Sequence, residues 1–367
     1  MRLNFLAPGI AWLTLTTLAH AGGTVVTFDS GAQGWSINGL TAITPTGGNP
    51  DHRIHWDDPV DTFVLSARTS TNNAFLGDYT ARGATTLAID IQVDSIQFFG
   101  GNVPRELAVI LYDDDPFNGA PAAFVWSSLG VLDGNGTGWL SYEANITDVF
   151  SSTLPAGWGG GGDEDPMTFE PILPAGRSWT DVLQGVDRVE FTTGIPGFVF
   201  GFTNFDLSID NVRTEPFTGA SFCDAADGSL ASCPCGNPGD PDTGCDIQQA
   251  TGGVKLDLVQ QESGAPNRVT WSGSGFPASG TPTAIVIRAA TLEPAPVAFG
   301  DGLRCVGTPL VRLGAAFAIG GTSTHTHGHG MGAGSGDFHY QLWFRNTPAM
   351  FCTPDAFNLS NGRSLTW

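Results

Sequence analysis

The chain has 367 residues, a net charge of −21 at pH 7 and a hydrophobic fraction of 41%. The hydrophobic fraction argues against a disordered chain, and the acidic balance argues against nucleic acid and anionic membrane surfaces as partners, since both would repel the protein. The 50 glycines and 24 prolines, with no long helical periodicity, favour short strands joined by turns.

Residues 1–21 have the pattern of a secretory signal peptide. Arg2 gives a short positive start, residues 5–18 are mostly apolar, and the tripeptide Ala-His-Ala at 19–21 matches a cleavage site. A membrane anchor is the alternative, but the apolar stretch is short and is interrupted by proline and glycine. No later apolar run reaches spanning length. We therefore expect a secreted or cell-surface protein, cleaved near Ala21, with no membrane span.

Apolar runs in the first half predict strands, which we expect to form one domain over residues 22–216. Residues 85–93 place Leu87, Ile89, Ile91 and Val93 on one face. The continuous run 107–112 predicts a strand buried on both faces. The other predicted strands are 24–28, 139–144, 187–191 and 205–212, with one helical turn at 180–184. These spacings predict an all-β fold of the sandwich or jelly-roll type.

Residues 75–91 (FLGDYTARGATTLAIDI) resemble the central stretch of laminin domain IV and related galactose-binding-like jelly rolls. The segments 28–35 (FDSGAQGW) and 207–212 (LSIDNV) also fit such modules. The resemblance covers most of residues 24–215. It implies a non-catalytic binding or adhesion module, without implying a particular sugar.

Two features of this first domain suggest binding sites. In galactose-binding-like jelly rolls the first and last strands lie close together, so Asp29 and Asp210 could hold a structural calcium ion with backbone carbonyls. The alternative is that Asp29 caps a turn and Asp210 faces solvent. Trp158 stands beside the glycine run 159–162, which predicts an exposed loop, and exposed tryptophans stack on sugar rings. The alternatives are that Trp158 belongs to the core and that the glycines are a linker.

The six cysteines all lie in the last 145 residues, at Cys223, Cys233, Cys235, Cys245, Cys305 and Cys352. Four of them fall in a Gly/Pro-rich junction, residues 217–250, with the spacing C-x9-C-x-C-x9-C. Structural zinc sites favour C-x2–4-C pairs, so this spacing and an oxidising compartment favour disulfides over zinc. Connectivity is open from the sequence; the pairing we expect is two bonds within 223–245 and one between Cys305 and Cys352.

Residues 251–367 predict a second, disulfide-stapled β-sandwich-like domain, with strands at 253–259, 267–271, 283–288, 311–313 and 338–344. Asn361-Gly362 predicts a tight hairpin turn. The segments 233–239 (CPCGNPG), 300–305 (GDGLRC), 340–345 (YQLWFR), 351–352 (FC) and 357–362 (FNLSNG) resemble a C-terminal domain of large secreted bacterial proteins. That resemblance implies secretion and no particular chemistry.

The segment 324–331 (THTHGHGM) departs from this resemblance. On a strand, His325, His327 and His329 would share one face, where imidazoles could bind zinc or copper. The glycine-rich residues that follow favour a flexible loop with no specific metal site instead.

No catalytic constellation is recognisable. The chain lacks a G-x-S-x-G elbow, an H-E-x-x-H motif and a phosphate-binding loop. The leading hypothesis is a secreted non-catalytic protein that attaches to an extracellular polysaccharide or a surface protein through its N-terminal jelly roll, with no cofactor beyond the structural calcium considered above. The alternatives are a structural cell-surface or assembly component that binds no small ligand and, less favoured, a secreted hydrolase.

Overall fold

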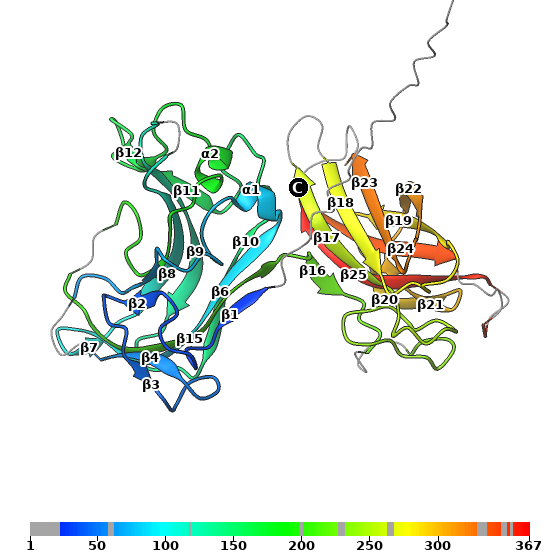
Figure 1. Ribbon diagram of the computed structural model, residues 1–367, viewed down its shortest axis with the longest axis horizontal. Coiled ribbons are helices and arrows are strands. Elements are labelled where there is room, and N and C mark those ends of the chain that lie inside the picture. The colour runs from blue at the N-terminus through cyan, green and yellow to red at the C-terminus, as the bar shows by residue number, and fades with distance from the viewer. Residues whose placement is uncertain are drawn as a thin grey trace, which may run out of the picture.

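The computed structural model of the protein describes residues 23–57, 62–116, 119–198, 201–226, 232–262, 268–328, 336–345, 351–352 and 355–367 (Figure 1). The predicted signal peptide, its cleavage site and His329 lie outside these residues. Within them the fold is all-β, as predicted, and every paired strand is antiparallel to its neighbour in the sheets described below.

The first region, up to residue 216, contains two large sheets. The seven-stranded sheet has the order β10-β6-β15-β4-β3, with β1 beside β15 and β7 beside β6. The six-stranded sheet has the order β11-β9-β8-β14-β5-β2, and β12 pairs with β13 separately. The strands are β1 (Thr24–Val26), β2 (Trp35–Ile37), β3 (Ile43–Thr44), β4 (Arg53–Asp57), β5 (Ser66–Thr69), β6 (Thr85–Phe98), β7 (Gly101–Asn102), β8 (Arg105–Asp113), β9 (Ala123–Leu132), β10 (Leu140–Ile146), β11 (Trp158–Gly161), β12 (Asp163–Glu164), β13 (Pro171–Ile172), β14 (Arg188–Thr192) and β15 (Asn204–Pro216).

One hydrophobic core fills the space between these two sheets. Strand β6 contributes Leu87, Ile89, Ile91 and Val93 to it, which are the residues that the alternation predicted. The continuous apolar run of β8 is buried from Leu107 to Leu111, which confirms the prediction of a strand covered on both faces.

Two short helices lie at one end of this sandwich (Figure 1). Helix α1 (Tyr79–Arg82) begins at Asp78, whose carboxylate accepts the N–H groups of Thr80 and Ala81. Helix α2 (Trp179–Leu183) begins with a capping box between Ser178 and Asp181, which confirms the predicted helical turn at 180–184 within one residue.

The second region is built from smaller sheets. A five-stranded sheet has the order β16-β25-β24-β19-β22, a three-stranded sheet has the order β17-β18-β23, and β20 pairs with β21. The strands are β16 (Ala220–Phe222), β17 (Lys255–Glu262), β18 (Arg268–Ser274), β19 (Thr283–Ala289), β20 (Leu292–Phe299), β21 (Gly302–Val306), β22 (Val311–Phe317), β23 (Thr322–Gly328), β24 (Asp337–Arg345) and β25 (Phe357–Thr366). The predicted boundary near residue 217 falls between β15 and β16, which follow one another in the chain (Figure 1).

Buried polar side chains hold these smaller sheets together. The Arg363 guanidinium of β25 is 2% exposed; it donates to the carbonyl oxygen of Leu256 and to the carboxylates of Asp242 and Asp257. Because an arginine buried in this way needs all its partners, the final strand is fixed to β17 and to the cysteine-rich segment.

The side chain of Gln341 plays a similar part where the β20–β21 pair covers the five-stranded sheet. Its Oε1 accepts the N–H groups of Cys305 and Val306, and its Nε2 donates to the carbonyl oxygens of Leu303 and Ser360. A single amide therefore satisfies backbone groups of both β21 and β25, which would otherwise be buried without partners.

All six cysteines form disulfides, as predicted, but the expected pairing is wrong in two of its three bonds. The bonds are Cys223–Cys305, Cys233–Cys245 and Cys235–Cys352. Only Cys233–Cys245 lies within the segment 223–245. The other two fasten that segment to β21 and to the residues before β25, and Cys305 does not pair with Cys352. Partners here are chosen by the tertiary fold, which brings residues 82 and 117 positions apart together.

Three other local predictions are also wrong. Asn361-Gly362 is not a hairpin, because β25 runs straight through it: the Asn361 amide is buried and accepts the N–H of Leu256, and the ring of Phe222 packs where a side chain at Gly362 would lie. The glycine run after Trp158 is edge strand β11 rather than an exposed loop. His325 and His327 lie on strand β23 rather than on a flexible loop.

Candidate functional site

The outer face of the seven-stranded sheet carries a continuous set of polar side chains. Alternation along three adjacent strands produces it: Ile54, Leu207 and Ile91 point into the core, and the intervening residues point outward. These outward residues are Arg53, His55 and Asp57 on β4, Asp206, Ser208 and Asp210 on β15, and Asp90, Gln92 and Asp94 around β6. Register places His55 opposite Ser208 and Asp210 opposite Asp90.

His55, Asp94 and Asp206 form a compact cluster at one end of this face. One ligand atom from each lies within 4.8 Å of the others. His55 Nδ1 lies 3.0 Å from Ser208 Oγ, and its Nε2 lies 3.6 Å from Asp206 Oδ1. Burial, followed by the charges of Asp94 and Asp57, raises the pKa of Asp206. Asp206 Oδ1 is buried beside His55 and accepts no hydrogen bond among the described residues, while the Asp206 side chain as a whole is 33% exposed.

Asp90 and Asp210 form a second cluster on the same face, and their pKa values shift in opposite directions. Burial raises the pKa of Asp210 to about 6, and the charge of Asp90 adds to this effect. Burial opposes the charged form of Asp90 as well, but the hydrogen bonds from Arg213 and Asn211 outweigh it and lower the pKa of that carboxyl.

The loop containing Asn49 rests on these carboxylates. Asp210 Oδ2 accepts the N–H of Asn49 at 2.6 Å, and Asp90 Oδ2 accepts the Asn49 side-chain amide at 3.0 Å. Asn211, which has a φ of 45°, sits at an irregularity in the β6–β15 register and donates to Asp90. Backbone irregularities of this kind often re-aim side chains at functional sites.

The predicted calcium residues Asp29 and Asp210 both contact this loop. Asp29 Oδ1 lies 2.6 Å from His52 Nδ1, and Asp29 Oδ2 accepts the Thr27 hydroxyl at 2.9 Å. Asp210 is fully buried rather than facing solvent, and its oxygens accept backbone N–H groups of Asn49 and Asn211. Protein donors therefore compete for the lone pairs that a calcium ion would need. Calcium binding by this pair stays a prediction, and no function is assigned through it.

Trp158 is half-buried rather than displayed on a loop. Its ring packs edge to face on Trp179 at 4.7 Å between centroids and contacts the hydrophobic core between the two large sheets. The glycines that follow are needed because the side chains of Trp126, Leu173 and Phe124 cover them. A sugar contact at Trp158 stays a prediction, and a core role explains the residue without one.

His325 and His327 share the inner face of β23, with ring centroids 5.9 Å apart. His325 is 1% exposed, and its Nε2 lies 3.0 Å from Ser323 Oγ. Burial, followed by the charge of His327, lowers the pKa of His325 to about 4, so the ring is neutral at neutral pH. Zinc or copper binding here stays a prediction, and its third predicted ligand, His329, lies outside the described residues.

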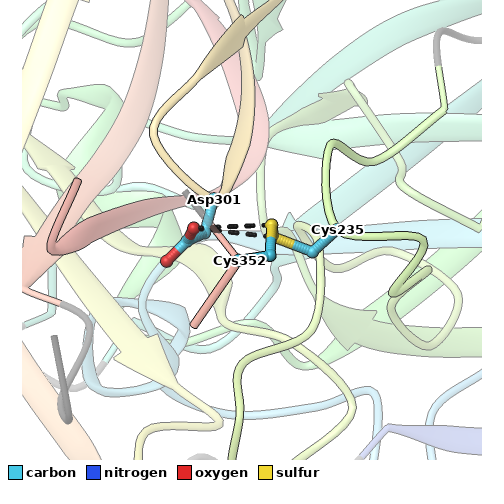
Figure 2. A group of neighbouring side chains, drawn as sticks. All are labelled: Cys235, Asp301 and Cys352. Carbon is cyan, nitrogen blue, oxygen red and sulfur yellow. Dashed lines mark hydrogen bonds between the residues drawn. A yellow bond between two sulfur atoms is a disulfide. The ribbon is translucent and has the colours of Figure 1, made fainter. Parts of the chain in front are cut away.

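Another group of side chains of the kinds that bind metals contains a disulfide bond, which makes its two sulfur atoms unavailable as thiolate ligands. Cys235, Asp301 and Cys352 lie within 4.8 Å of one another, and Figure 2 shows the Asp301 carboxylate beside the Cys235–Cys352 disulfide. Sulfur ligands bind metals as thiolates, so the oxidised pair offers none. We assign this group a structural role.

The outer-face clusters were missed in the sequence, although the signal was present. The alternation that placed Leu87, Ile89, Ile91 and Val93 inward also places Asp90 and Gln92 outward. What the sequence does not give is the strand order, which sets β15 between β4 and β6 and brings His55 to Asp94 and Asp206.

No helix among the described residues is long and apolar enough to cross a membrane. No family model matches the chain, and no significant match to a curated protein was found.

Proposed function

We propose that the protein is a secreted, non-catalytic binding protein that attaches to an extracellular polysaccharide through the outer face of its seven-stranded sheet. In this proposal residues 22–216 are the binding domain, of the galactose-binding-like type that the sequence resembles, and residues 251–367 are a second domain stapled by the cysteines of the junction.

The observation that carries the proposal is the connected polar face of β4, β15 and β6. Sugar hydroxyls both donate and accept hydrogen bonds, so they pair with carboxylates, amides and imidazoles. Hydrogen bonds to charged groups contribute about 1.5–3 kcal/mol each. The Asp206 side chain is 33% exposed on this face, so its carboxylate can accept a hydrogen bond from a hydroxyl.

A glycan array with the full chain tests this proposal. The expected result is a reproducible polysaccharide hit that is lost when Asp94→Asn and Asp206→Asn are combined. The matched control combines Asp163→Asn and Glu164→Gln on exposed strand β12, which removes the same charge elsewhere. Arrays run with calcium and with a chelator also test the cation prediction. No hit for the unaltered chain, together with stable oligomers in solution, would favour a structural assembly component instead.

A hydrolase is the second candidate, because Asp90 and Asp210 face one another with oppositely shifted pKa values. Such pairs often divide into an acid and a base. Both oxygens of Asp210 accept backbone N–H groups, however, which favours a structural role for that carboxyl. Release of reducing ends from a bound glycan, lost in Asp210→Asn, would establish the hydrolase.

A further inference from the structure

A concave surface lies on the other region of the molecule, where the β20–β21 pair leaves part of the five-stranded sheet uncovered. A cavity of about 470 Å³ is lined there by Ile287, Phe299, Leu310, Arg312 and Trp343. The opposite face of the same strands packs into a separate hydrophobic core of this region through Val286 and Leu342. The cavity therefore sits on a rigid floor, and its volume falls within the roughly 300–1,000 Å³ typical of small-ligand sites.

The lining has one charged group among apolar side chains. Trp343, Phe299 and nearby Phe357 pack against one another with ring centroids 4.9–6.1 Å apart. The Arg312 guanidinium carbon lies 4.7 Å from the centre of the Trp343 ring. This cation–π contact holds the planar fork of Arg312 beside the cavity and limits the rotamer entropy that binding would cost.

Arg312 differs from nearby Arg304 in that Arg304 forms an ion pair with a carboxylate. Arg304 stacks on Phe299 at 5.4 Å and is neutralised by Glu293, with Arg304 Nη2 to Glu293 Oε1 at 2.6 Å. No such carboxylate pairs with Arg312 within the described part of this chain, which has 36 acidic residues in all. An unpaired guanidinium beside an apolar cavity is complementary to an anion that carries an apolar body.

We propose that this cavity binds an amphiphilic carboxylate, whose aliphatic or aromatic body fills the space over Ile287 and Trp343 and whose carboxylate pairs with Arg312. The apolar body contributes affinity through the surface that it removes from water. The guanidinium contributes orientation and selects the charged head group. A sugar fits this site less well, because its hydroxyls would meet apolar walls with a single polar partner.

Calorimetric titration of the full oxidised chain tests the site with three probes: octanoate, 1-octanol and acetate. Octanol keeps the apolar body without the charge, and acetate keeps the charge without the body. Octanoate should bind at least 10-fold more tightly than either of the other two. Arg312→Gln should weaken octanoate binding roughly 10- to 100-fold, since it removes a charge-assisted hydrogen-bonding pair, and should leave octanol binding unchanged.

Two further variants make the test specific. Arg268→Gln removes an exposed arginine from β18, away from the cavity, and should leave octanoate binding unchanged. Leu310→Glu places a carboxylate at the cavity wall and should abolish octanoate binding with little loss of stability, because Leu310 is only partly buried and precedes β22. No binding of octanoate at millimolar concentration, or equal affinities for octanoate in the unaltered chain and in folded Arg312→Gln, would overturn the proposal.

Discussion

The two regions of this molecule are stabilised by different means. The first, which has no cysteine, encloses its core between sheets of seven and six strands. The second has sheets of five, three and two strands, a smaller core, three disulfides and buried polar groups such as Arg363 and Gln341. The comparison teaches that cross-links and buried hydrogen bonds supplement burial where the sheets are too small to enclose a large core.

Reduction of the disulfides should produce the largest difference in stability between the two regions. In the chain-entropy view, closing loops of 82 and 117 residues stabilises a fold by about 4–5 kcal/mol per bond. Hydrogen exchange followed by mass spectrometry, with and without a dithiol reductant, should show loss of protection in β21, β24 and β25 and none in β6, β8 and β15. Equal loss in both regions would break the comparison.

The Arg363→Met variant should have the next largest effect. It removes the buried donor shared by the Leu256 carbonyl and the carboxylates of Asp242 and Asp257, while the more exposed Lys255 still pairs with both carboxylates. We expect a cost of up to about 3–5 kcal/mol. Urea unfolding measures the change. Arg345→Met, an exposed position on β24, is the control and should change the free energy of unfolding by less than about 0.5 kcal/mol.

Acidification should lower the stability of the second region around His325 and raise that of the first region around Asp210. The pKa of His325 is lowered in the fold to about 4, so its contribution to stability is present above pH 6.5 and is lost as the pH falls through 4. The pKa of Asp210 is raised to about 6, so its contribution is present below pH 3.8 and is lost as the pH rises through 6. Each contribution is on the order of 3 kcal/mol across its window.

Hydrogen exchange of β23 and of β15 between pH 4 and 7, corrected for intrinsic rates, measures these two contributions. On acidification β23 should lose protection while β15 gains it. His325→Gln should flatten the first trend and Asp210→Asn the second. Parallel trends in the unaltered chain would contradict the assignment.

A glycine substitution should give the smallest effect, in the first region. A side chain at Gly161 would overlap the Phe124 ring, so Gly161→Ala should destabilise the sandwich by about 1–3 kcal/mol. Gly138→Ala meets no atom within 4 Å, and we expect its melting temperature to stay close to that of the unaltered chain. If the melting temperature of Gly161→Ala is no lower than that of Gly138→Ala, the Phe124 ring does not require a glycine at position 161.

The sequence predicted well wherever burial alone decides the structure. The inward residues of β6 and the continuous run of β8 could be read from their periodicity, and so could the all-β class. Glycines that were interpreted as turn or loop residues lie in strands instead. They are glycines because an aromatic ring from elsewhere in the chain occupies the space of a side chain. Phe222 over Gly362 and Phe124 over Gly161 come from strands that the local sequence does not reveal.

The candidate site also has a part that the sequence predicts and a part that depends on the order of the strands. Alternation alone assigns Asp90 and Asp94 to an outer face, but it cannot say that His55 from β4 lies within reach of Asp94 and Asp206. The disulfide partners of Cys223 and Cys235 could not be predicted for the same reason, because both depend on which strands the fold brings beside the junction.

The Cys235–Cys352 bond also has a mechanical consequence. A force applied between the first region and the C-terminal residues would be carried along the chain that joins them. Because that bond joins positions 117 residues apart, the tension bypasses the sheets they contain. About 400 Å of extended chain is thereby withheld from stretching. Under such a load, the residues between Cys235 and Cys352 could extend only after the bond is reduced.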